Sequence, residues 1–172
     1  MGLFKKLKQG MGIGTVSFDL EVPAQVPATS GTIDGFIVIT AKSEQKINDV
    51  EVRLERLQSW EERVETFNTS TNLFDVRWET RTNTATISEW KDTSSFSLTE
   101  GESKRIPFTL AFPPMDKPYG DAQDSVLWGF ISAALDYNNG WRGARIDYRV
   151  TGDADVEDAA FDKGDDVIIV LM

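Results

Sequence analysis

Apolar and polar residues alternate along much of this chain, which is the period of a β-strand with one buried face. Residues 15–22 place valine, phenylalanine and leucine at every second position, with serine and acidic residues between them. Residues 106–112 alternate in the same way, although Pro107 lies inside the run and two further prolines end it. Residues 32–41 are apolar on both faces, as expected for a strand in the centre of a sheet. The pattern predicts three strands, one of which must tolerate a proline.

The pattern of residues 50–67 has two interpretations. The first half alternates as a strand does, whereas Leu57, Trp60 and Val64 also fit one face of a helix. We predict a long strand, because the first half is strand-like and strand patterns surround the segment.

A second long, exposed strand is predicted for the Thr-rich residues 73–90, after a turn at residues 68–72. It is either continuous or a hairpin bent at Thr82 and Asn83. Shorter strand patterns follow at residues 94–98, 144–156 and 166–171. About eight strands separated by turns predict an all-β fold, an antiparallel β-sandwich.

One segment has the period of a helix instead. Residues 124–136 carry apolar side chains over one broad face, and Asp124 suits the N-cap position. The sequence therefore predicts one short helix, which we interpret first as a lid over the mouth of the sandwich. The alternative is a surface for a protein partner or for a homodimer, centred on Trp128, Phe130 and Ile131.

Residues 1–12 form a separate basic amphipathic N-terminal segment. Its apolar residues fall on one face of a helix and its lysines surround them: Leu3, Phe4, Leu7, and Lys5, Lys6, Lys8. An anionic membrane surface attracts such a segment, so peripheral membrane contact through the N-terminus is one interpretation. The other, given equal weight, is that the apolar residues pack on the protein itself or on a second subunit.

Composition narrows the function. With 172 residues the chain is long enough for one domain, which we assign to residues 13–172. It contains no cysteine and no histidine, so it has no disulfide, no thiolate metal site and no Ser-His or Cys-His nucleophile. We therefore expect no enzymatic activity, no metal and no cofactor.

Charge and hydropathy limit the possible cellular location and the classes of binding partner. The net charge of −10 argues against a nucleic-acid partner, because phosphate binding needs a basic surface. The opening residues have no cleavage site of a signal peptide, and no apolar run approaches the roughly 20 residues of a membrane span. We expect a cytoplasmic protein, peripheral at the inner face of the membrane if the N-terminal segment binds lipid.

Two motifs resemble those of arrestin-like domains. Gly101 precedes the stretch PFTLAFP at residues 107–113, and IDYRV follows at residues 146–150. In such domains the first of these strands borders its sheet. The resemblance gives Pro107 a place, because on an edge strand its missing donor can point outward.

Further stretches are similar to the bacterial, arrestin-fold sporulation-control protein family. They are FKKLKQGMGIG at residues 4–14, VPATSGTIDGFIVI at 26–39 and DADVEDAAFDKGDDVIIV at 153–170. The last is similar to the end of that family's first domain, so the whole chain corresponds to one arrestin N-domain-like sandwich. The resemblance implies a non-catalytic adaptor or scaffold that binds protein partners and membranes through strand edges and loops.

The chain also departs from that family. Residues 27–29 read Pro-Ala-Thr where the family has Pro-Gly-Glu, although Gly35 is in place. Family members usually carry a further portion after the first sandwich. We therefore expect no arrestin clasp between two half-domains within this chain, and we carry over no phosphate-sensing mechanism.

Two alternative functions rest on local patterns. A calcium site is suggested by Asp153, Asp155 and Glu157 at loop positions 1, 3 and 5, but Asp158 and Gly164 stand where Gly and Glu are required. A solvated acidic loop is the favoured interpretation there. A carbohydrate-binding sandwich is suggested by five tryptophans, which would have to face solvent on one sheet: Trp60, Trp78, Trp90, Trp128 and Trp141.

Overall fold

The computed structural model describes residues 15–114, 141–157, 159 and 163–172. This part of the chain forms nine strands: β1 (Val16–Glu21), β2 (Gln25–Val26), β3 (Thr32–Ala41), β4 (Gln45–Asn68), β5 (Leu73–Asp92), β6 (Phe96–Leu98), β7 (Ser103–Ala111), β8 (Trp141–Val156) and β9 (Lys163–Leu171). None of the described residues is helical, so none of them forms a helix that could span a membrane. The predicted helix at 124–136 and the N-terminal segment lie outside the described residues.

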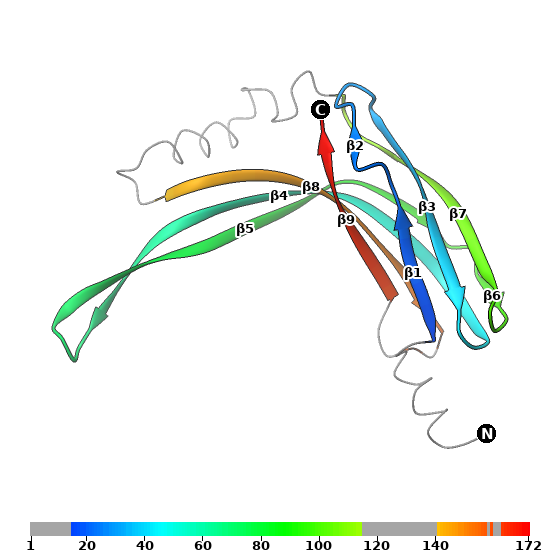
Figure 1. The fold of residues 1–172 in the computed structure, drawn as a ribbon, viewed down its shortest axis with the longest axis horizontal. Coiled ribbons are helices and arrows are strands. Elements are labelled where there is room, and N and C mark those ends of the chain that lie inside the picture. Colours follow the sequence, from blue (N-terminus) through cyan, green and yellow to red (C-terminus); the bar gives the residue numbers. More distant parts are fainter. Residues whose placement is uncertain (1–14, 115–140, 158, 160–162) are drawn as a thin grey trace, which may run out of the picture.

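The strands build two layers (Figure 1). One is a three-stranded sheet in the order β1-β3-β7, and the other is a six-stranded sheet in the order β2-β9-β8-β4-β5 with β6 paired to β4. The core lies between them and is formed by inward-facing aliphatic side chains, of which the largest fully buried ones are Ile33, Ile37, Ile39, Ile47, Val50, Val52, Leu54, Leu98, Leu110, Val150 and Ile169. The predicted all-β sandwich is confirmed.

The proline strand lies where the motif predicted it. Strand β7 is an edge of the three-stranded sheet, with β3 on its other side. Ile106, Phe108 and Leu110 are buried, whereas Pro107 is exposed opposite Phe36. A strand that needs hydrogen bonds on one side only can accommodate a residue without a donor.

Strands β4 and β5 form a hairpin much longer than the sandwich. Their ladder runs from Val50 opposite Asp92 to Asn68 opposite Leu73. Strand β8 accompanies β4 only as far as Glu62, and beyond it β5 is the sole described strand that pairs with β4. The hairpin therefore projects away from the two layers (Figure 1). We call its outer part, residues 59–82, the arm.

Of the two alternatives for β5, the structure shows the continuous strand. Thr82 and Asn83 continue the ladder opposite Ser59 and Gln58. The irregularity lies further along, where the register shifts between Leu54 and Glu55. The reversal of the chain occurs at the predicted turn of residues 68–72, where Asn72 has a positive φ of 56°.

Two further segments add to the predicted strands. Residues 23–31, where the sequence shows no strand pattern, contain β2, which pairs in parallel with β9. Residues 153–156 were predicted both as the end of a strand and as part of an acidic loop, and the structure shows the strand: they belong to β8, where Ala154 and Val156 face the core. The acidic residues therefore alternate with core residues and occupy the outer face of a strand.

Candidate interaction surfaces

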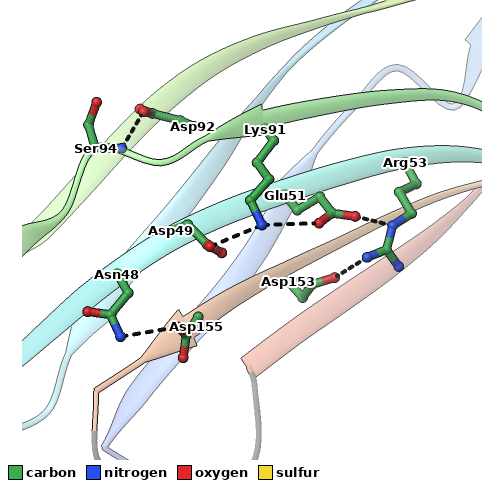
Figure 2. Close-up of polar contacts among 9 residues, drawn as sticks. All are labelled: Asn48, Asp49, Glu51, Arg53, Lys91, Asp92, Ser94, Asp153 and Asp155. Carbon is green, nitrogen blue, oxygen red and sulfur yellow. Dashed lines mark hydrogen bonds and ion pairs between the residues drawn. The ribbon is translucent and has the colours of Figure 1, made fainter.

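A charged ladder crosses the outer face of the six-stranded sheet (Figure 2). Glu51 on β4 lies opposite Lys91 on β5 and Asp153 on β8. Lys91 Nζ lies 3.0 Å from Asp49 Oδ2 and 3.6 Å from Glu51 Oε2. Arg53 contacts Glu51 and lies 3.9 Å from Asp153 Oδ1. Each base bridges two acids, which offsets the like-charge pair of Glu51 and Asp153.

The pKa shifts in the ladder agree with pairing between its own residues. The contact with Glu51 raises the pKa of Arg53, and the hydrogen bond to Asp49 raises the pKa of Lys91. Both bases therefore keep their positive charge to a higher pH than a free side chain would. The charges of the ladder pair with one another across β5, β4 and β8.

The acidic residues of the suggested calcium site take part in the same kind of contact. Asn48 donates to Asp155 (3.1 Å), and Lys46 donates to Glu157 (2.7 Å). Asp153 lies near Arg53 on the neighbouring strand. In the described part of the chain no three acidic side chains gather as metal ligands do. The geometry is that of cross-strand pairs along a sheet and gives the calcium interpretation no support.

The tryptophans do not share a face. Trp60 and Trp78 lie on opposite faces of the arm, because Trp60 is paired with Arg81 and Trp78 with Arg63, one position out of phase. Trp90 packs against the core, with its ring 6.1 Å from that of Phe108. The three described tryptophans therefore form no platform for a sugar.

The end of the arm exposes large apolar side chains. Phe67 is 48% exposed, Phe74 64%, Val76 49% and Leu73 66%. Phe67 and Phe74 face each other across the hairpin, with ring centroids 5.3 Å apart, and Val76 follows on the same face of β5. We call these four residues the apolar tip. Water-exposed aromatic pairs of this kind are typical of contact surfaces.

The opposite face of β5 is charged. It carries Asp75, Arg77, Glu79 and Arg81 at alternate positions. Arg77 lies 2.6 Å from Glu79, and Arg81 lies 3.2 Å from Glu79 and 2.8 Å from Glu62 of β4. Strand β5 thus has an apolar face and an ionic face, whereas the paired positions of β4 mix charged and apolar residues on both faces.

Two hollows in the described part of the chain are small. One groove of about 160 Å³ lies where β8 and β9 separate, between Ile146, Tyr148 and Ile168. Another of about 260 Å³ lies beside Trp60 and Arg145. Both are smaller than the cavities of several hundred Å³ in which small ligands are usually held.

The predicted site residues lie elsewhere in the chain. Leu3, Phe4, Lys5, Lys6, Leu7 and Lys8, and Trp128, Phe130 and Ile131, fall outside the described residues. The apolar tip was missed by sequence reasoning. A signal was present, because Phe67 and the pair Leu73 and Phe74 flank a five-residue polar turn that cannot bury them.

Comparison with known proteins decides the family. The sequence pattern of the family Spo0M, described as SpoOM protein, matches residues 4–136, which is more than half of the chain. The chain belongs to the Spo0M family. No curated protein matches.

A solved member has the same fold. The crystal structure of Spo0M, a sporulation control protein from Bacillus subtilis, superimposes with a TM-score of 0.56 at 18% identity. The match covers 92% of this chain and 50% of that chain, so this chain spans about half the length of the Bacillus Spo0M structure. The expected arrestin-like sandwich of the sporulation-control family is confirmed.

Proposed function

We propose that this Spo0M-family chain is a non-catalytic cytoplasmic adaptor that holds a protein partner on its arm. The single observation that carries the proposal is the apolar tip, where Phe67 and Phe74 pack edge to face in solvent at the end of a projecting hairpin. Truncating such a tip would leave the sandwich core untouched, since the core residues lie between the two sheets. An arm of this kind serves contact with another molecule.

Chemistry supports the non-catalytic part of the proposal. The sequence has no histidine and no cysteine, and the described residues gather no metal-ligand cluster. The acidic residues of the outer sheet face are engaged with arginine, lysine and asparagine. Among the described residues, the apolar tip and the strand edges offer means of recognition that suit protein contacts.

The experiment is a pull-down from the native host with quantitative mass spectrometry. The test variant is Phe67→Ser with Phe74→Ser. A matched control is Ile168→Ser with Val170→Ser, which removes two equally exposed apolar residues from β9. The tip variant should lose at least one specifically retained protein that the wild type and the β9 variant keep.

Two results would contradict the proposal. If the β9 variant alone loses the partner, the contact lies on the outer sheet face and not on the arm. If no host protein is enriched over an unrelated sandwich protein of similar charge, the adaptor function is wrong. Melting curves of all variants check that the fold is intact.

The proposed location has its own test. We propose that the basic segment of residues 1–12 contacts an anionic membrane surface. Vesicles with anionic lipid should retain the protein, less so as salt rises, and deleting residues 1–10 should abolish retention without lowering the melting temperature. A deletion that unfolds the domain, with no retention of the intact chain, would make the segment structural.

A further inference from the structure

The outer edge of β5 is open along the arm. Strand β5 ends the six-stranded sheet, and no other strand of the described part pairs with its far side. Open edges offer unpaired backbone donors and acceptors to any second strand. The side chains beside the edge decide which strand can join it and in which register.

The ionic face of β5 is complementary to itself. When two copies of a strand pair antiparallel about a two-fold axis, residues at equal distances from the axis face each other. An axis at Trp78 sets Asp75 opposite Arg81 of the second copy and Arg77 opposite Glu79 of the second copy. Both pairs occur twice, so all four charges of each strand meet an opposite charge.

Other registers lack this match. Moving the axis one residue to position 77 opposes Arg77 to itself and Asp75 to Glu79, and moving it to position 79 opposes Arg77 to Arg81. Moving it two residues either way leaves one complementary pair, formed twice: Asp75 with Arg77, or Glu79 with Arg81. Registers with the axis between two residues would place the apolar face of one β5 strand beside the ionic face of the other. The sequence therefore favours one register above its neighbours.

The apolar face of β5 also fits a two-fold axis at Trp78. Trp78 would meet Trp78 of the second copy at the axis, and Val76 would lie diagonal to it. Val76 is 49% exposed in the single chain and gains apolar neighbours in the pair. Arg77 and Arg81 are 67% and 47% exposed, so both can turn from their own strand toward a facing one.

We propose that two copies of this chain join edge to edge through β5, antiparallel and centred on Trp78, so that one sheet runs through both arms. The inference does not rest on the adaptor function, since it concerns the purified chain alone. Phe67 belongs to β4 and is not at this edge, so the apolar tip is only partly covered by the pairing.

Charge exchange tests the pairing. Sedimentation velocity over a concentration series should show a monomer–dimer equilibrium for the wild type. Arg77→Glu with Arg81→Glu makes the face wholly acidic, and Asp75→Arg with Glu79→Arg makes it wholly basic. Each variant alone should dimerise at least about tenfold more weakly, and an equimolar mixture of the two should restore the dimer.

Two controls isolate the edge. Lys42→Glu with Lys46→Glu changes the net charge as much as the acidic arm variant does, but away from the arm, and should leave dimerisation unchanged. Because the chain has no cysteine, Trp78→Cys provides a single thiol at the axis. Facing Cα atoms of antiparallel strands lie within disulfide range, so mild oxidation should cross-link this variant and not Thr82→Cys.

The outcomes separate clearly. A wild type that stays monomeric up to high micromolar concentration overturns the proposal. So does a mixture of the two charge variants that stays monomeric while each variant melts as the wild type does. Cross-linking of Thr82→Cys in preference to Trp78→Cys contradicts the proposed register.

Discussion

Gly35 on β3 is a position where adding one methyl group should destabilise the sandwich. A Cβ atom there would lie 2.6 Å from Phe108 Cζ, 2.8 Å from Val22 Cγ1 and 2.9 Å from the Glu21 carbonyl oxygen. Comfortable contacts between carbon atoms are about 3.5–4.0 Å. The Glu21 oxygen belongs to β1, which is hydrogen-bonded to β3, so it cannot withdraw without shifting the ladder.

The expected magnitude follows from two opposing effects. Overpacking a core typically costs about 1–3 kcal/mol, and replacing glycine in a strand recovers about 0.5–1 kcal/mol. Gly35→Ala should therefore lower the free energy of unfolding by about 1–2 kcal/mol. At about 2–4 °C per kcal/mol for a domain of this size, the melting temperature should fall by about 2–8 °C. Urea unfolding followed by tryptophan fluorescence measures the same loss.

A double-mutant cycle tests the cause. Phe108→Leu removes the Cζ atom that lies nearest to the added methyl, so Gly35→Ala should cost less in that background. Gly101→Ala is the contrasting change. No atom lies within 4 Å of its Cβ position, but its φ of 83° disfavours any side chain, so its cost should not depend on Phe108. Strict additivity of Gly35→Ala and Phe108→Leu would refute the steric argument.

Three further changes test the energetics of the fold. Glu55→Gln should destabilise the protein by about 1–2 kcal/mol in urea unfolding, because two guanidinium nitrogens of Arg149 donate to Glu55 Oε2 at 2.8 and 3.1 Å in a half-buried site. Arg63→Gln, in the exposed pair with Glu65, should change stability by less than about 0.5 kcal/mol. Hydrogen bonding from the Thr99 backbone lowers the pKa of Glu102. Its contribution is therefore present above the unfolded-state pKa and is lost as pH falls through the folded value. NMR titration should show the lowered pKa, and Glu102→Gln should flatten that part of the acid denaturation curve.

Periodicity predicted the parts of the fold in which one face of a strand meets a core. The inward positions of β1, including Phe18 and Leu20, and those of β7 follow the alternation of the sequence. The edge position of Pro107 was also predictable, since a missing donor can be accepted there. Both cases depend on local chemistry that the sequence displays directly.

The arm could not be predicted in the same way. The alternation through Trp60 and Val64 is the same whether or not a second sheet covers it, so the pattern predicts the strand without its surroundings. Two residues, as in β2, are too few to show any period. In residues 153–156 the alternation of Ala154 and Val156 with the acids predicted the strand, whereas the acidic composition alone suggested a loop.

The most direct test of the arm as the interaction element is site-specific photo-cross-linking in living host cells. A photoreactive phenylalanine analogue is placed at Phe74, which is 64% exposed on the arm, or at Ile168, which is 55% exposed on β9. We expect defined adducts, with a partner protein or with a second copy, from position 74 and few from position 168. Adducts from position 168 without any from position 74, or none from either, would contradict this expectation.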